Sequence, residues 1–422
     1  MRSEDAPAAP RPVSGAGRFE FATAGRIVFG AGAIRDAGEI AAGLGRRPLV
    51  VTGRARERAQ PLLALLAERG AEPATFAVDG EPDVEIVRLG TDFVRAERCD
   101  CVIGFGGGAA LDAAKAIAIL ATNPGDVMDY LEIIGHGKTL NEPPLPCVAI
   151  PTTAGTGSEV TRNSVISSRE HQVKVSLRNP MMLPSVAVID PELTYGLPPA
   201  LTATTGLDAL TQLIEPFVCI RANPMTDGLC LEGIPRVARS LRRAFEGGRD
   251  ARAPGAGKAE GAATHPGGDA ALAAAREDMA VASLFGGLAL ANAGLGAVHG
   301  LAGPLGGTIA APHGAVCAAL LPVVVQANLR ALRARAPESP ALPRYQRIAQ
   351  LLTGNPTATA NDAVDWLRRL VVDLRVPGLG AYGTGPAVIA ELAGKAARAA
   401  AMKANPVELT REELAAIIEG AL

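Results

Sequence analysis

The stretch DCVIGFGGGAALDAAK, from Asp100 to Lys115, contains the pattern that decides the fold. Its first half, DCVIGFG, is a short apolar run typical of a buried β-strand. Three consecutive glycines end this run, and the residues after them have the composition of a helix. Glycine lets the backbone approach a ligand closely, and the N-terminus of a helix attracts anions. The stretch therefore predicts a strand–turn–helix unit that binds nucleotide phosphates, although its spacing is not GxGxxG. A tight turn without a ligand is the alternative.

The same alternation of strand and helix extends to both sides of this stretch. Further strands are expected at RIVFG, PLVVT, ATFAVD, PCVAIPTT and SVAVID, and helical segments separate most of them. This order is typical of an α/β domain, with a parallel sheet and helices on both faces. From about Pro198 helical periodicity dominates to the end of the chain. We therefore expect an α/β dinucleotide-binding domain over residues 18–195 and an all-helical domain over residues 196–422.

Two segments of biased composition lie outside this pattern. Residues 1–17 are rich in Ala, Pro and Gly, which predicts a disordered N-terminal extension. Residues 247–270 are rich in Gly and Ala with mixed charge, which predicts an exposed loop inserted between two helices.

The composition of the 422 residues excludes several classes of function. The net charge is −2 and aromatic residues make up 3%, so neither a basic surface nor stacking platforms for nucleic acid are expected. No uncharged apolar run is long enough to predict a transmembrane helix, and we expect no membrane partner. Six scattered cysteines without a CxxC pair predict free thiols in a reducing compartment. The N-terminus has no apolar secretion signal, so we expect a cytoplasmic protein.

A second loop also follows a predicted strand. PTTAGTGSEVT, from Pro151 to Thr161, places the hydroxyls of Thr152 and Thr153 after the strand CVAI. Ligands bind at the carboxyl ends of strands in open parallel sheets, so this loop is a candidate cofactor site. A Thr- and Gly-rich surface turn is the alternative.

Candidate metal ligands come from the helical half. Asp208 and Gln212 lie four residues apart in the apolar segment GLDALTQLIEP, and therefore share one helix face. His299 and His313 lie in apolar surroundings almost a hundred residues later. A buried carboxylate is costly unless it is paired or coordinates a cation. One Asp with two His is a plausible three-ligand set for Zn or Fe(II), whereas hydrogen-bonded core histidines are the alternative.

Together these motifs resemble the iron-containing (group III) alcohol dehydrogenases, related to glycerol dehydrogenase and maleylacetate reductase. GFGGGAALDAAK resembles the phosphate loop of that family, and PTTAGTGSEVT resembles its second nucleotide loop. VHGLAGPLGGTIAAPHG resembles its histidine motif. The resemblance implies a dehydroquinate synthase-like fold and hydride transfer between NAD or NADP and an alcohol or carbonyl substrate. It also implies a divalent metal, Fe(II) or Zn, that polarises the substrate oxygen, and a homodimer or larger assembly.

The resemblance assigns roles to individual residues. It implies Asp208, His299 and His313 as metal ligands at the catalytic site. For the cofactor it implies Gly106, Gly107, Gly108 and Asp112 at the pyrophosphate, and Thr152, Thr153 and Lys174 near the nicotinamide and its ribose.

Three positions depart from the family pattern. Gln212 stands where the iron enzymes have a further histidine ligand. Because an amide is a weak, neutral ligand, we expect Gln212 at the catalytic site to orient water or substrate rather than to bind the metal strongly. Gly303 stands where they often have another histidine. Gly53 stands where NAD-preferring relatives often have an aspartate that contacts the ribose, so we expect NADP(H) to be accepted at this cofactor position, with Arg54 and Arg56 meeting its phosphate. Two solvated helix arginines are the alternative.

The departures keep other functions open. The first alternative is a metal-independent reductase of the maleylacetate type. A lyase like 3-dehydroquinate synthase is less favoured, because few basic residues lie near Asp208 in the sequence. The non-enzymatic alternative is a nucleotide-binding protein that lost its chemistry through the changes at Gln212 and Gly303.

Overall fold

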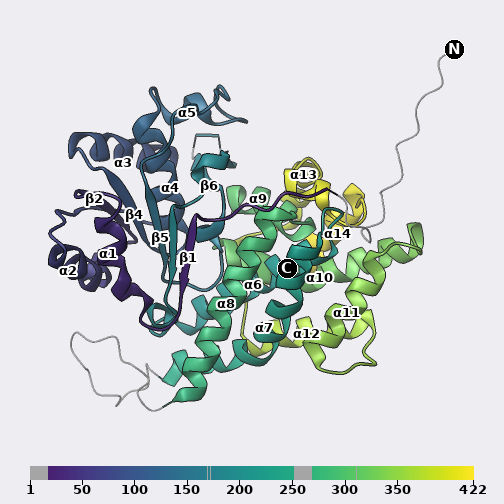
Figure 1. Cartoon of the computed structure of the whole chain (residues 1–422). Coiled ribbons are helices and arrows are strands. Elements are labelled where there is room, and N and C mark those ends of the chain that lie inside the picture. The colour runs from purple at the N-terminus through teal and green to yellow at the C-terminus, as the bar shows by residue number, and fades with distance from the viewer. Residues whose placement is uncertain (1–17, 169, 172, 251–268, 310) are drawn as a thin grey trace.

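The computed structural model describes residues 18–168, 170–171, 173–250, 269–309 and 311–422. The N-terminal half is built on a six-stranded sheet in the order β1-β8-β5-β4-β2-β3, in which all neighbours are parallel. In that order the strands are β1 (Arg26–Phe29), β8 (Val186–Ile189), β5 (Cys147–Pro151), β4 (Cys101–Gly106), β2 (Pro48–Thr52) and β3 (Ala74–Ala77). The five strands expected around the glycine stretch are thus all present, and the parallel α/β fold is confirmed (Figure 1).

The register of the sheet brings three predicted cofactor segments to one edge. Thr52, the last residue of β2, pairs with Phe105, and Gly106, the last residue of β4, pairs with Pro151. The loops that begin at Gly53, Gly107 and Thr152 therefore leave the sheet side by side. Carboxyl ends of adjacent parallel strands form the usual ligand crevice of such sheets.

Alternate residues of the central strands face different helices. Val50 packs in a cluster with α1 (Ala37–Ala42) and α2 (Gln60–Glu68). Its neighbours Leu49 and Val51 pack in another cluster with α3 (Val84–Ala96) and α4 (Gly108–Thr122). Because successive side chains of a strand point to opposite faces and both faces are covered, all five residues of PLVVT are buried and the first four are apolar. A short helix, α5 (Val127–Tyr130), follows α4.

A two-stranded antiparallel hairpin was not expected from the sequence. It consists of β6 (Asn163–Ser168) and β7 (Val173–Arg178), and contacts α4 on one side and α9 on the other. Its strands alternate between buried and partly exposed residues, and they carry serines and charged residues. This hairpin bridges the two halves of the chain and places Lys174 between them.

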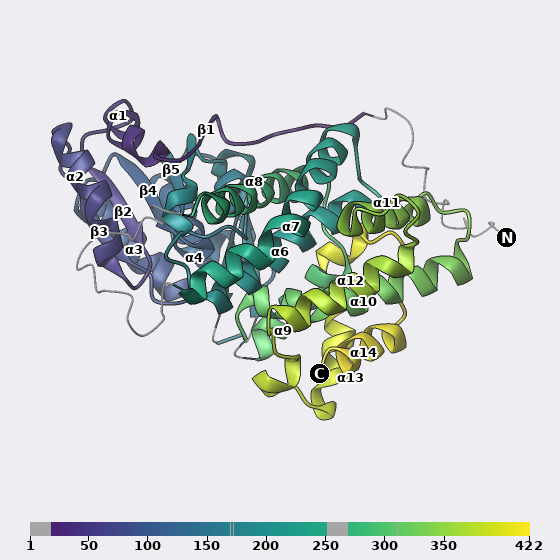
Figure 2. The same cartoon turned by 90° about the horizontal axis from the view of Figure 1, so that it is seen from below.

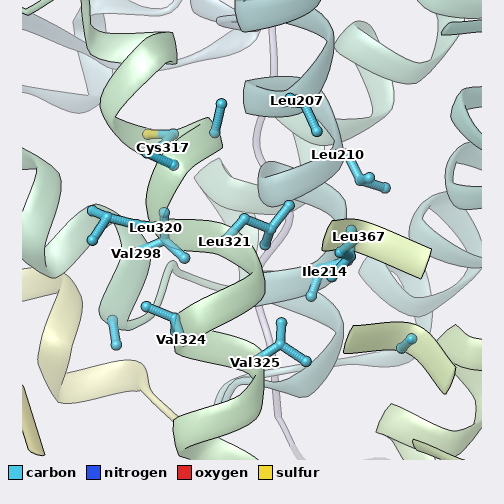
Figure 3. Close-up of a cluster of buried hydrophobic side chains, with 14 of the residues drawn as sticks. Leu207, Leu210, Ile214, Val298, Cys317, Leu320, Leu321, Val324, Val325 and Leu367 are labelled. Carbon is cyan, nitrogen blue, oxygen red and sulfur yellow. The ribbon is translucent and has the colours of Figure 1, made fainter. Parts of the chain in front are cut away.

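The C-terminal half is all-helical, as expected (Figures 1 and 2). Its α-helices are α6 (Pro199–Val218), α7 (Pro224–Asp250), α8 (Ala270–Asn292), α9 (Ala297–Thr308), α10 (His313–Arg335), α11 (Ala341–Thr353), α12 (Ala360–Asp373), α13 (Pro386–Ala396) and α14 (Arg411–Gly420). Their core is almost entirely aliphatic. In Figure 3 Leu207, Leu210 and Ile214 of α6 face the side chains of α10 and α12.

The two segments of biased composition lie largely outside the described residues. This holds for residues 1–17 and for 251–268 of the expected loop insertion. The first four residues of that insertion, 247–250, are helical, because α7 continues to Asp250. A Cβ at Gly247 would lie 2.4 Å from Leu272 of α8, and one at Gly248 would lie 2.9 Å from the Leu197 carbonyl. Glycine therefore allows α7 to pack closely here, and the loop prediction was wrong for these four residues.

One helix of the described part, α10, is long and apolar enough to span a membrane by length and composition alone. However, 78% of its most apolar stretch is buried. Its apolar residues belong to the core of the helical half. We therefore interpret α10 as a core helix.

Candidate metal and cofactor site

Helix α6 carries a buried polar stripe. Asp208, Gln212 and Glu215 are spaced about one turn apart, and their exposed fractions are 1%, 3% and 4%. The leucines of the same helix face the aliphatic core. Two buried carboxylates on one helix are unfavourable without compensating partners, so the stripe requires positive charge or hydrogen-bond donors from other elements.

Those partners come from α9 and α10. The Nε2 atom of His299 lies 3.5 Å from Asp208 Oδ1, and the Nε2 atom of His313 lies 3.9 Å from the same oxygen. Cys317, one turn after His313 on α10, has its Sγ 3.6 Å from His313 Nε2. The donor atoms of these four residues all lie within 4.8 Å of one another. The structure thus brings Asp208, His299 and His313 together and adds the thiol of Cys317.

Glu215 fixes the orientation of His299. Its Oε2 accepts a hydrogen bond from His299 Nδ1 at 2.7 Å, and its Oε1 accepts one from the Val298 backbone N–H at 2.6 Å. Asn405 Oδ1 accepts the neighbouring N–H of Ala297 at 3.1 Å. The first turn of α9 is therefore held by side chains from α6 and from the C-terminal region. Because Nδ1 donates to Glu215, Nε2 is left to face Asp208.

The electrostatics of this cluster favour a positive charge between the carboxylates. Burial disfavours the charged form of Asp208, but the close approach of His299 and the charge of His313 outweigh it and lower the pKa of Asp208. Burial also opposes protonation of His299, but Asp208 and Glu215 raise the pKa of His299 to about 10. The pKa of the Cys317 thiol is raised well above its usual value by burial and by both carboxylates.

Two buried oxygen atoms in this region remain without a hydrogen-bond partner among the described residues. They are Asp208 Oδ1 and Gln212 Oε1. An orphaned carboxylate oxygen, beside two imidazoles that can each offer a nitrogen, fits the coordination chemistry of a divalent transition metal. The residues present are therefore suited to hold such an ion.

The glycine stretch lies directly against the second loop. Gly107 is the N-cap of α4, and a Cβ there would lie 3.4 Å from the Thr153 side chain. A Cβ at Gly108 would lie 2.8 Å from Thr156. Any larger side chain at Gly108 would displace the second loop, which accounts for glycine at this position. The backbone N–H groups at the start of α4 have the chemistry that suits an anion such as a phosphate.

Asp112 has a structural function within this cofactor region. Its carboxylate accepts hydrogen bonds from the Ser158 hydroxyl and from the Val165 backbone N–H, the latter at 2.8 Å. It also pairs at 3.2 Å with Lys115, which is buried and donates to the Ser158 carbonyl and to the Thr161 hydroxyl. Asp112 and Lys115 together tie α4 to the second loop and to β6.

The remaining cofactor candidates, Lys174 and Gly53, also line the cavity. Lys174 on β7 pairs with Glu81 at 2.5 Å, and its side chain is 10% exposed. Gly53 has open space around the position of a Cβ. Of the two arginines expected to meet a ribose phosphate, Arg54 lines the cavity, whereas Arg56 does not belong to the described lining. Arg58 lines it instead, because the turn at residues 56–59 carries Arg58 toward Leu193, whose carbonyl it contacts at 3.2 Å.

One cavity of about 1530 Å³ joins these groups. It is larger than the roughly 300–1,000 Å³ typical of a pocket for a single small ligand, and therefore has room for a dinucleotide and a substrate. Its lining includes every candidate cofactor, metal and catalytic residue of the sequence analysis except Arg56: Gly53, Arg54, Gly106, Gly107, Gly108, Asp112, Thr152, Thr153, Lys174, Asp208, Gln212, His299 and His313.

Sequence reasoning missed Glu215 and Cys317. Both could have been found by helical spacing, because Glu215 lies three residues after Gln212 and Cys317 four residues after His313. The sequence could not show that the face of α6 with Glu215 lies close to the face of α10 with Cys317.

Comparison with known proteins agrees with this geometry. Residues 24–191 match the family described as iron-containing alcohol dehydrogenase. Residues 202–260 and 262–422 match the C-terminal domain of the Fe-containing alcohol dehydrogenase family. The 1,3-propanediol dehydrogenase of Klebsiella pneumoniae is 37% identical over 422 residues, covering 96% of this chain and 98% of that protein.

Solved structures of related oxidoreductases have the same fold over almost the whole chain. A 1,3-propanediol oxidoreductase superposes with a TM-score of 0.84 at 35% identity, covering 96% of this chain and 100% of the other. The sulfoacetaldehyde reductase of Bifidobacterium kashiwanohense, solved in complex with NAD+, superposes with a TM-score of 0.79 at 28% identity, covering 96% and 99%. The fold, the shared cavity and these matches agree, and the chain belongs to the iron-containing alcohol dehydrogenase family of NAD-dependent alcohol and aldehyde oxidoreductases.

Proposed function

We propose that this enzyme interconverts an alcohol and its aldehyde or ketone at a divalent cation held by Asp208, His299 and His313. One observation carries the proposal: these three side chains converge in the same cavity as the glycine-rich start of α4. A bound nicotinamide supplies or accepts the hydride, and a bound cation acts as a Lewis acid toward the substrate oxygen.

The residues of the chain perform the positioning. Gly107, Gly108 and the start of α4 bind the phosphates, while Thr152 and Thr153 line the wall between them and α6. Glu215 holds the His299 ring with Nε2 toward Asp208. At Gly303, one turn after His299, a Cβ would meet nothing within 4 Å, so this part of the cavity is open to substrate or water.

We further propose that the cation is zinc. One carboxylate with two imidazoles is a ligand set that catalytic zinc sites use, and Cys317 adds a sulfur atom within the cluster. Gln212 lines the cavity with a neutral amide, which weakens its claim as a ligand. Three strong ligands suffice for a catalytic zinc site, because such sites keep one position open for water or substrate.

A metal-independent reductase is the second candidate. It is favoured by Gln212 and by the open space at Gly303, because both remove an imidazole expected from the family resemblance. The convergence of Asp208 with two histidines speaks against it. A homodimer or larger assembly belongs to the proposal as well, and it rests on the family resemblance alone. A cytoplasmic location is also part of the proposal, and it rests on the sequence pattern of the N-terminus and the unpaired cysteines.

The cofactor proposal is that NADPH is used as well as NADH. Gly53 offers no carboxylate to repel a ribose phosphate, and Arg54 and Arg58 line the cavity near Gly53 in the sequence. The Arg54 side chain is 85% exposed and pairs only loosely with Asp79, at 3.9 Å, so it is available to a phosphate. Reduction of an aldehyde, followed by nicotinamide absorbance, should give kcat/KM values for NADPH and NADH within about tenfold of each other.

The variant Gly53→Asp tests whether the glycine at this position is what allows the enzyme to use NADPH. Its side chain enters open space, and its charge should lower kcat/KM for NADPH by about tenfold or more while sparing NADH. Gly53→Asn is the matched control, since it adds the same volume without charge. Strong preference of the unaltered enzyme for NADH would refute the proposal for NADPH. Absence of turnover with either cofactor would refute the proposed function.

A further inference from the structure

Cys317 differs from the other cysteines of the chain in what surrounds it. It lies one turn after His313 on α10 (Figure 3), is fully buried, and has its Sγ 3.6 Å from His313 Nε2. The chain has six cysteines, and all of them are buried free thiols. Among the described residues, Cys317 is the only cysteine that belongs to a group of potential metal ligands. A thiol that merely fills space in the core does not need such neighbours.

The spacing of the four donor atoms fits a single tetrahedral ion. Asp208 Oδ1 lies 3.5 Å from His299 Nε2 and 3.9 Å from His313 Nε2, and Cys317 Sγ lies 3.6 Å from the latter nitrogen. Zinc binds nitrogen and oxygen at about 2.0–2.2 Å and sulfur at about 2.3 Å, which separates the donor atoms of a tetrahedral site by roughly 3.3–3.7 Å. All pairs of donor atoms in the cluster lie within 4.8 Å. Small movements of the side chains therefore suffice for one ion to contact all four atoms.

A hydrogen bond from the thiol cannot satisfy the whole cluster. The Cys317 thiol has one hydrogen, and it can donate that hydrogen to only one neighbour. If it donates to His313 Nε2, the buried Asp208 Oδ1 keeps no hydrogen-bond partner among the described residues. An unpaired buried carboxylate oxygen is costly. A cation shared by the four residues compensates Asp208 and uses both imidazole nitrogens and the sulfur at the same time.

The geometry also leaves the fourth place to α10 and not to Gln212. A Cβ at Gly286 of α8 would lie 3.4 Å from Gln212 Oε1, so this amide oxygen lies against α8, whereas the clustered donors come from α6, α9 and α10. Asp208 and both histidines line the cavity, but Cys317 does not belong to its described lining. The sulfur thus approaches from the side away from the cavity. The side that faces a substrate stays open, and catalytic zinc sites can expand to five ligands.

We infer that Cys317 is the fourth protein ligand of the cation, and that its thiolate takes over from the histidine that the iron enzymes have at the position of Gln212. The inference rests on the proposed function, because it concerns the same metal site. When the sulfur binds the ion, the thiol proton passes to solvent. A coordinating thiol loses this proton outright, because the positive charge of the ion stabilises the thiolate.

The direct test is the absorption spectrum of the full-length enzyme after chelation and titration with Co(II). Cobalt accepts the same nitrogen, oxygen and sulfur ligands as zinc but, unlike zinc, it absorbs light. A thiolate ligand gives Co(II) an intense near-ultraviolet charge-transfer band, which carboxylate and imidazole ligands do not give. We expect this band to grow until about one Co(II) is bound per chain.

The spectrum separates the inference from the proposed function. Stoichiometric binding of Co(II) without the charge-transfer band would overturn the inference but leave the proposed metal site intact. Failure of the enzyme to bind Co(II) at all would count against the proposed function, and the inference would fall with it.

Three variants identify the ligand. Cys317→Ala should abolish the band and raise the Co(II) dissociation constant by about 100-fold or more, because losing a direct ligand costs more than losing an outer partner. Cys230→Ala is the matched control, since Cys230 is an equally buried thiol of the helical core outside the cluster, and it should change neither quantity. Gln212→Ala should keep the band. A band that persists in Cys317→Ala, or that disappears in Gln212→Ala, would contradict the inference.

Discussion

At the scale of single residues, Glu215 is the least expected part of the site. It does not belong to the four clustered donors, yet it binds His299 Nδ1 and the backbone of α9 at the same time. A carboxylate in this relation to a metal-binding histidine fixes the ring orientation and raises the basicity of the other nitrogen. The effect of Glu215 on the metal is therefore indirect, through the orientation and the electron density of the imidazole.

Replacing this carboxylate with an amide should weaken metal binding. For Glu215→Gln we expect a 10- to 100-fold rise, as an order of magnitude, in the zinc dissociation constant measured by competition with a chromophoric chelator. The amide has nearly the same shape, so the fold should persist. Glu419→Gln, an exposed position on α14, is the control. A dissociation constant within twofold of the unaltered enzyme would show that Glu215 only caps α9.

The residue scale also shows what the sequence can and cannot reveal. Asp208 stood out because a carboxylate in an apolar helix is costly, and its burial and its two histidine neighbours agree with that reasoning. Arg56, which was expected to meet a ribose phosphate, is not part of the described cavity lining, whereas Arg54 and Arg58 are. The difference is two residues within one 3-10 turn, and local turn geometry decides which side chain faces the cavity.

At the scale of elements, the sequence predicts buried strands better than half-exposed ones. The strands β2, β4 and β5 were evident because every residue in them is buried, which makes their sequences uniformly apolar. The hairpin of β6 and β7 was missed because it is partly exposed and carries polar residues. The end of α7 was placed too early because its glycines, which normally signal a loop, serve close packing against Leu272 and Leu197.

The second loop includes a short element with a pH-dependent contribution to stability. Glu159, in the 3-10 helix η3 (Ser158–Val160), is 2% exposed, and burial raises the pKa of this carboxyl to about 7. The folded protein thus holds this proton more tightly than the unfolded chain does. The tighter binding of this proton therefore stabilises the folded state fully at pH values below the unfolded pKa near 4.5. This stabilisation is lost as the pH rises through the folded pKa of about 7.

The variant Glu159→Gln should remove this pH dependence. The free energy of unfolding of the variant minus that of the unaltered enzyme should become more positive as the pH rises from about 5 to about 8. The total change in this difference should be on the order of 3 kcal/mol. Urea unfolding monitored at several pH values measures this difference. Parallel pH profiles for the two proteins would contradict the account, because they would mean that Glu159 titrates equally in the folded and unfolded states.

At the scale of the whole molecule, the site exists only because two differently built halves meet. The parallel sheet supplies the start of α4 and the loops after β2 and β5, and the helical half supplies α6, α9 and α10. Each half of the site could be predicted from its own motifs. Their distance from one another could not, because no local pattern encodes how α6 packs against the loop at Gly155, where Thr205 lies 2.5 Å from the position of a Cβ.

The central claim is that Asp208, His299 and His313 jointly hold a divalent cation that the reaction requires. The most direct measurement is the metal content of the enzyme, together with its turnover of a simple aldehyde such as butyraldehyde, before and after exhaustive chelation and again after zinc is added. We predict about one zinc ion per chain at first, loss of turnover in step with loss of the ion, and recovery when zinc returns. Full turnover by an enzyme shown to contain no metal would contradict the claim and establish the metal-independent alternative.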